Sequence, residues 1–129
     1  MVGLLRDVVF ERGRTWQLAA LPTRSVALDG AVVGPQIDHP GRRYSFDHHG
    51  VCVRHATLSA CEQVRDALRV GFDPRGFAAY LNNLDADSIL ALWLLAHPER
   101  LAEPAVGDLV AAVGRQDALG PGAGLPYHG

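Results

Sequence analysis

The stretch YSFDHHG, residues 44–50, decides the fold that we predict for this chain. Its first three residues alternate apolar, polar and apolar, which is typical of a short β-strand, and Asp47, His48 and His49 follow directly. Side chains alternate along a strand, so Asp47 and His49 share one face, and a turn after His49 can bring all three towards one point. Burying a carboxylate and two imidazoles is costly unless something binds them. Because oxygen and nitrogen ligands gather divalent metals, the stretch predicts a metal site at a strand end.

Composition limits the class of protein. A chain of 129 residues is long enough for one domain with a single core, which we expect over residues 1–121, with a flexible glycine-rich tail over 122–129. The formal net charge of -2 does not indicate binding to nucleic acid or to an anionic membrane. Cys52 and Cys61 are too few for a disulfide framework, so we expect reduced thiols in a cytoplasmic protein. The longest apolar run, residues 89–96, is too short to span a bilayer.

Several segments read as strands around residues 44–46. Residues 8–10 and 15–21 are candidates, and residues 25–30 form an apolar run that ends in Asp29 and a glycine. The segment 76–82 could be a strand or a short helix. Asp29 has two interpretations that stay open: a carboxylate placed for chemistry at the end of a buried strand, or an Asp-Gly turn that joins two strands.

Helical signals follow the central stretch. Residues 56–59 open a helix with apolar residues at helical spacing, and Gly71 ends it. Thr57 or Ser59 would cap this helix, and Ser59 and Glu62 make a capping-box pattern. Residues 106–113 read as a shorter helix that ends at Gly114, with Asp117 in a turn beyond it. We therefore expect an α/β fold, a small three-layer sandwich with a largely parallel sheet and buried helices.

A second acidic motif, LDADS, occupies residues 84–88, directly before a segment that is apolar almost all round. Asp85, Asp87 or Ser88 is a natural N-cap for this buried helix. Two carboxylates exceed what one cap needs, and a helix N-terminus also favours a phosphate bound to a metal. Further upstream, a hairpin turn at Gly41 would bring Asp38 and His39 beside the central cluster.

Together, these two motifs resemble the signatures of the DHH phosphoesterase superfamily. This superfamily includes manganese-dependent pyrophosphatases, RecJ-like exonucleases and phosphodiesterases of short RNA or cyclic dinucleotides. The resemblance covers residues 46–95, and it implies that Asp85 and Asp87 each bind one ion of a Mn²⁺ pair, with Mg²⁺ as the alternative. Asp47 and His48 would belong to the same metal shell.

The resemblance also implies roles for the second histidine of the Asp-His-His motif and for residues that follow it. His49 would lie close to the metal or the phosphate, and Arg54 or His55 would contact a phosphoryl oxygen. The implied activity is hydrolysis of a small phosphorylated or nucleotide-type substrate by a metal-activated water.

The chain also departs from the family pattern. The Asp-x-Asp motif follows Asp-His-His here, as in a circular permutation, and the chain has no room for the family's second domain. The position where the family has a metal-binding histidine is Leu81, so His39, His128 or a second copy of the chain would have to supply that ligand. The remaining family carboxylate is Asp29 or Asp117, and the permuted order favours Asp117.

Two other functions remain open beside the hydrolase. A degenerate relative would bind metal or nucleotide without hydrolysis, which Leu81 and the short chain favour. A regulatory or assembly domain would use the acidic motifs only as caps and turns.

Overall fold

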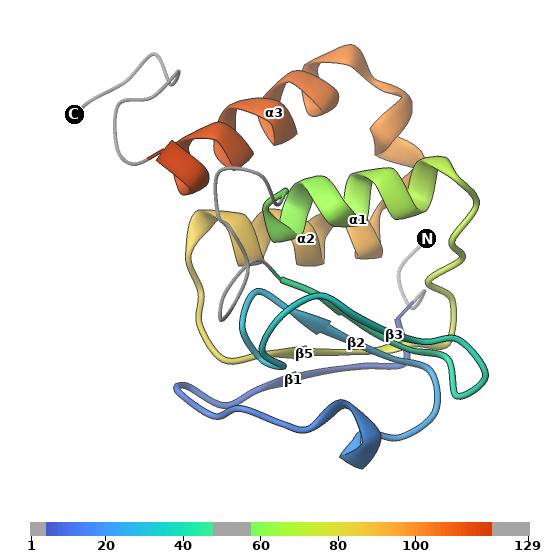
Figure 1. Ribbon diagram of the computed structural model, residues 1–129. Coiled ribbons are helices and arrows are strands. Elements are labelled where there is room, and N and C mark those ends of the chain that lie inside the picture. The colour runs from blue at the N-terminus through green and yellow to red at the C-terminus, as the bar shows by residue number, and fades with distance from the viewer. Residues whose placement is uncertain (1–4, 48–57, 120–129) are drawn as a thin grey trace.

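The computed structural model describes residues 5–47 and 58–119, with side chains up to residue 116. These residues form five β-strands, three α-helices and two short 3₁₀ helices (Figure 1). In chain order the elements are β1 (Asp7–Phe10), η1 (Leu18–Ala20), β2 (Ser25–Leu28), β3 (Gln36–Asp38), β4 (Arg43–Phe46), α1 (Ala60–Arg69), β5 (Ala78–Leu81), α2 (Ala86–Ala96), η2 (Pro98–Ala102) and α3 (Pro104–Leu119).

The strands make one sheet in the order β1-β5-β2-β4-β3. Among the described strands, four neighbours are parallel, and only β3 pairs antiparallel, with β4. The predicted α/β class with a largely parallel sheet is confirmed. Because β1, β5, β2 and β4 run the same way, their carboxyl ends meet at one edge of the sheet, and that edge positions the site described below.

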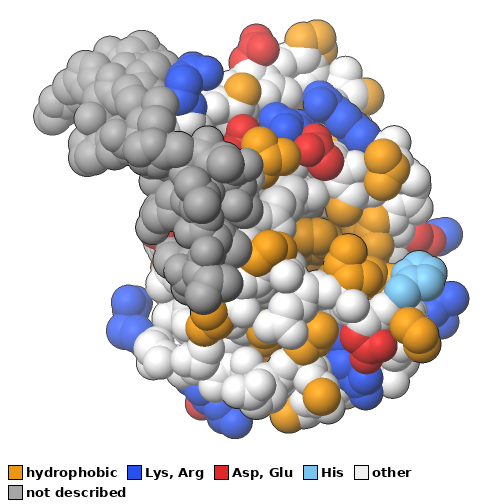
Figure 2. All heavy atoms as spheres, in the orientation of Figure 1, with side chains coloured by type: hydrophobic (Ala, Val, Ile, Leu, Met, Phe, Trp, Pro, Cys, Tyr) orange, Lys and Arg blue, Asp and Glu red, His pale blue; other side chains and the backbone are white. Residues whose placement is uncertain are grey.

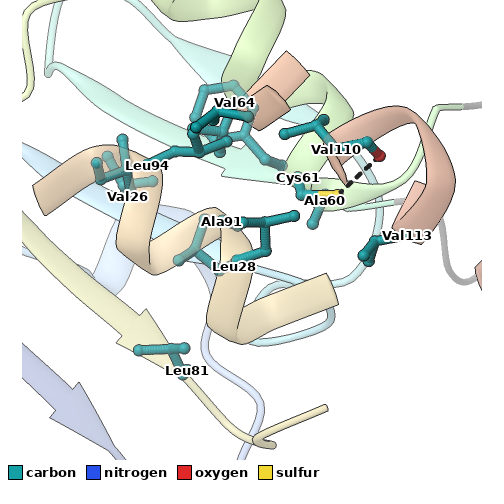
Figure 3. Packing of buried hydrophobic residues seen from close by; sticks show 14 of the residues in the cluster. Val26, Leu28, Ala60, Cys61, Val64, Leu81, Ala91, Leu94, Val110 and Val113 are labelled. Atoms are coloured by element: carbon teal, nitrogen blue, oxygen red, sulfur yellow. Dashed lines mark hydrogen bonds between the residues drawn. The ribbon is translucent and has the colours of Figure 1, made fainter. Parts of the chain in front are cut away.

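All three α-helices lie on one face of the sheet, with α1 and α2 between the strands and α3 (Figure 1). The core between these layers joins Val26 and Leu28 of β2 to Val64 of α1 and Leu94 of α2, all fully buried (Figure 3). The thiol of Cys61 in α1 donates to the carbonyl oxygen of Val110 in α3 at 3.8 Å, which links the two helical layers. No helix within the described ranges is long and apolar enough to cross a membrane.

The other face of the sheet is covered by the segment that holds η1. Leu18 and Leu21 are buried there against Ala27 of β2. We predicted a strand over residues 15–21, and this prediction is wrong. The backbone N–H groups of Ala20 and Leu21 donate to carbonyls three residues back instead of to a neighbouring strand, so the apolar side chains cover the sheet rather than extend it.

Helix α3 is longer than its sequence suggests. Gly114 was expected to end it and to leave Asp117 in a turn, but the helix continues to Leu119. A glycine costs a helix only about 1 kcal/mol relative to alanine. At this position a β-carbon would collide with the side chain of Glu62, so the glycine lets α3 pass close over the start of α1.

Candidate site at the carboxyl edge of the sheet

Two buried carboxylates end neighbouring parallel strands. Asp29 follows β2 and Asp47 follows β4, and the last residues of these strands, Leu28 and Phe46, are register partners. The N–H of Asp29 donates to the carbonyl of Phe46 at 2.9 Å, which carries the pairing one step beyond the strands. Only 1% of Asp29 and 0% of Asp47 is exposed. The carboxyl edge of a parallel sheet is the usual place for a ligand site in this fold class.

Asp29 is part of a tight turn. Asp29 and Gly30 both have positive φ, 47° and 95°, and the N–H of Ala31 closes the turn on the carbonyl of Leu28 at 3.2 Å. Aspartate tolerates this left-handed conformation better than most residues. The predicted Asp-Gly turn is therefore present, and it lies at the end of a buried strand.

Asp47 is fixed through its side chain and its main chain. Its Oδ2 accepts the N–H of Gly34 at 2.7 Å, and its carbonyl oxygen accepts Nε2 of Gln63 at 2.7 Å. Both contacts come from segments outside β4, so the position of this carboxylate is set by tertiary structure.

Asp87 lies in the first turn of α2 but caps a different helix. Its two oxygens accept the N–H groups of Ala60 and Cys61, at 3.0 and 2.8 Å, at the start of α1. The Ser59–Glu62 capping box predicted from the sequence is also present at this helix end. A buried carboxylate is favourable there because the N–H groups and the helix dipole both stabilise negative charge.

Asp85 is the N-cap of α2, as one interpretation of the sequence predicted. Its Oδ1 accepts the N–H of Ser88 at 2.9 Å, and the residue is exposed. The two aspartates of the Asp-x-Asp motif therefore hold the N-termini of two different helices.

Two asparagines that the sequence interpretation passed over connect these parts. Nδ2 of Asn82 donates to the carbonyl of Gly30, and Nδ2 of Asn83 donates to that of Asp29, both at 3.0 Å. Asn83 Oδ1 also accepts the hydroxyl of Ser88 at 3.2 Å. The signal in the sequence that could have identified these connecting residues was the pair of adjacent amides between a strand and an acidic helix start.

His39 lies at the other end of the sheet. The turn at Gly41 does join β3 to β4, but the hairpin pairs Asp38 with Arg43, the first residue of β4, three strand steps or roughly 10 Å from Phe46. Nδ1 of His39 contacts the hydroxyl of Tyr44 at 3.0 Å. The hairpin thus holds Asp38 and His39 away from Asp47, not beside it.

The remaining predicted site residues are not all described. His48, His49, Arg54 and His55 lie outside the described residues. Asp117 lies in α3, not in the predicted turn, and its side chain is not described. Leu81, which stands where the resembled family has a metal-binding histidine, is a core residue that is 1% exposed.

The described residues do not by themselves form a metal site. Among them, no group of three His, Cys, Asp or Glu side chains could hold an ion. Asp29 and Asp47 fit the hard oxygen ligands that Mn²⁺ and Mg²⁺ prefer. Burial, with a smaller effect of Asp87, raises the pKa of the Cys61 thiol far above its ordinary value. The thiol stays protonated, which does not suit a thiolate ligand.

A pocket of about 470 Å³ lies beside this edge, between the β3–β4 hairpin and α1. Ile37, Phe46 and Leu58 give it an apolar lining, and Gln63 and Asp66 add polar groups. Figure 2 shows apolar side chains gathered across the middle of the visible face of the molecule. The volume is in the range of small-molecule sites.

The chain has no match among protein-family models, curated protein sequences or solved structures.

Proposed function

We propose that the protein is a divalent-metal-dependent phosphohydrolase that acts on a small phosphorylated or nucleotide-type substrate. The observation that carries this proposal is the pair of buried carboxylates, Asp29 and Asp47, at the ends of neighbouring parallel strands. Asp47 leads in sequence into His48 and His49, and the Asp-His-His and Asp-x-Asp motifs resemble those of DHH phosphoesterases. The proposal places the protein in the cytoplasm, on the evidence of its few cysteines.

The donor set fits Mn²⁺ or Mg²⁺. Asp29 and Asp47 would hold the ions together with His48, and the place of Asp29 beside Asp47 supports it over Asp117 as the remaining carboxylate. Bound ions would lower the pKa of a water molecule and neutralise phosphoryl charge. Asp85 and Asp87 stay in the proposed ligand set, because a carboxylate has about four lone-pair positions and can accept N–H bonds while it binds an ion.

The chain's own groups would complete the chemistry. His49 would donate a proton to the leaving oxygen, since an imidazole titrates near neutral pH. Arg54 or His55 would bind a phosphoryl oxygen. The apolar pocket beside Phe46 offers room for the non-phosphate part of the substrate.

The test is a Mn²⁺ titration of hydrolysis with pyrophosphate and with a generic phosphodiester. We expect turnover stimulated by Mn²⁺ in the natural chain and lost in Asp47→Asn, which keeps the shape of the side chain. Asp108→Asn, on the exposed side of α3, removes a carboxylate far from the edge and is the matched control. No stimulated turnover with either substrate, together with no Mn²⁺ binding by calorimetry, would refute the proposal.

A second candidate is a relative that binds metal or nucleotide without hydrolysis. The buried Leu81 favours it, because this leucine occupies the position of a metal-binding histidine in the resembled family. Calorimetry that detects tight nucleotide binding, with no product formed, would select this function over the first.

A further inference from the structure

Helix α2 has only apolar side chains from Ile89 to Ala96. A helix that is apolar all round is normally buried on every side. The side of α2 that faces the core is fully buried at Ala91 and Leu94, yet Ile89 is 49% exposed and Trp93 is only partly buried. The described residues therefore leave one side of this helix uncovered.

Helix α3 continues this apolar side. Leu109 is 49% exposed, and Ala105, one turn earlier on the same side of the helix, is exposed as well. The two helices run in opposite directions, joined by η2 (Figure 1). A groove of about 590 Å³ lies between them, with walls from Ile89 and Trp93 of α2 and from Leu109 and Val113 of α3. We call it the α2–α3 groove.

The α2–α3 groove has no net charge among the described residues that line it. Its charged lining residues are Arg100 of η2 and Glu103, which follows η2, and these two form an ion pair with each other. The Arg100 guanidinium also lies 5.3 Å from the centre of the Trp93 ring. A strongly basic or acidic partner finds no opposite charge on such a surface, whereas a second copy of the chain presents the same neutral surface in return.

The shape of this face also suits its own copy. A two-fold interface is self-complementary, so protruding side chains and a hollow must occur on the same face. Ile89 and Leu109 are half exposed beside the groove, and across a two-fold axis they can enter the hollow of the other copy. Ridges of helix side chains pack into grooves in this way when helices meet.

The size of the face limits the strength of such a contact. Helix α2 has 11 residues and α3 has 16, so they are roughly 16 and 24 Å long, and two packed helices are about 20 Å wide. The face covers roughly 400 Å² in flat outline, which is small beside the about 800 Å² of accessible surface that each partner buries in a standard interface. This size indicates a weak, reversible dimer.

We propose that the α2–α3 groove is the surface through which two copies of this chain associate as a weak symmetric dimer. Burial of the exposed apolar side of α2 drives the association. Ile89, Trp93 and Leu109 lie at the centre of the interface, where apolar and aromatic side chains contribute most. The groove uses no residue of the proposed metal site, so the inference stands independently of the proposed function.

The experiment is sedimentation equilibrium of the full chain over roughly 10 µM to 1 mM, where weak complexes form and dissociate. Leu109→Glu places a charge beside the groove and keeps a residue of good helix propensity. Ile89→Glu does the same on α2 and replaces the first variant if that one does not fold. Val33→Glu is the matched control, because Val33 is 50% exposed and lies outside both helices. Circular dichroism identifies the variants that are folded.

We expect the natural chain and Val33→Glu to associate alike. Each groove variant should associate at least about tenfold more weakly, because it brings two carboxylates into an apolar interface. In a Trp16→Phe background, the emission of Trp93 should shift to shorter wavelength as the protein concentration rises, since its ring leaves water.

Unchanged association of the folded Leu109→Glu and Ile89→Glu variants would place the interface elsewhere and overturn the proposal. A natural chain that stays monomeric over the whole range would overturn it too, and would leave the groove to another protein or to a part of the chain outside the described residues. Neither result would bear on the metal site, which Mn²⁺ binding tests separately.

Discussion

Asp87 of helix α2 caps helix α1: its Oδ2 accepts the N–H of Ala60 at 3.0 Å, across 27 positions of sequence. The second carboxylate oxygen bonds the next N–H, that of Cys61. This contact joins the acidic motif at residues 84–88 to the start of α1, and Gln63 of α1 bonds the carbonyl of Asp47, so the two motifs singled out in the sequence are linked through α1. The first prediction tests how much this connection stabilises the fold.

Asp87→Asn should lower the free energy of unfolding by about 1–3 kcal/mol, because one amide group can accept only one of the two buried N–H bonds well. Urea unfolding measures the change. The control is Asp108→Asn, which replaces an exposed aspartate of α3. Equal stability of the Asp87 variant and the natural chain would show that the cap contributes nothing measurable.

Asp85 allows its role as a cap to be separated from a role as a ligand. Asp85→Ser keeps an N-cap oxygen, so stability should stay within about 0.5 kcal/mol, whereas Asp85→Ala should cost about 1 kcal/mol. If Asp85 also binds an ion, as proposed, both variants should bind Mn²⁺ more weakly. Calorimetry with natural Mn²⁺ affinity in Asp85→Ser would leave the residue as a cap alone.

Mn²⁺ should stabilise the folded chain. An ion that binds only the native state at a hundred times its dissociation constant adds about 2.7 kcal/mol, which a melting curve detects. Asp29→Asn and Asp47→Asn should remove this effect, while Asp108→Asn should keep it. A melting temperature that does not respond to Mn²⁺ in the natural chain would favour a regulatory or assembly domain.

The β3–β4 hairpin should weaken in acid. The hydrogen bond from the Arg43 side chain, followed by that from the Gly41 N–H, holds the pKa of Asp38 below its ordinary value. A carboxyl whose pKa is lower in the folded state stabilises the fold above its unfolded pKa, and this stability is lost as the pH falls through the folded pKa.

Asp38→Asn should therefore flatten the acid side of the profile of stability against pH, below about pH 4, where an unperturbed aspartate titrates. Urea unfolding at a series of pH values gives the profile. Asp108→Asn again controls for the loss of one exposed carboxylate. Parallel profiles for Asp38→Asn and the natural chain would contradict the assignment of this pair.

Gly114 and Gly107 of α3 should respond in opposite directions to alanine. A β-carbon at Gly114 would collide with Glu62, which the capping box holds in place, so Gly114→Ala should cost about 1–3 kcal/mol. At Gly107 the nearest atom would be 3.4 Å away, on the flexible Arg69 side chain, so Gly107→Ala should stabilise by about 0.5–1 kcal/mol. Thermal unfolding of both variants decides, and a stabilised Gly114→Ala would argue against close packing of α3 on α1.

Local signals in the sequence were sufficient for much of the fold. The strands predicted over residues 25–30 and 44–46 are present as β2 and β4. The capping box at Ser59 and one of the candidate caps of α2, Asp85, are present too, because each of these features depends on residues at most four positions apart. The α/β class followed from the alternation of such segments.

Only the tertiary structure decided which segments meet. In the tertiary structure, residues 15–21 cover the sheet and α3 continues past Gly114. His39 lies at the opposite end of the sheet, and Asp29 lies beside Asp47. The tertiary structure also gave Asp87 and Gln63 partners on segments that no local pattern specifies. The physical reason is that turns and caps are fixed by neighbours along the chain, whereas strand order and helix packing are fixed by how the whole chain buries its apolar surface.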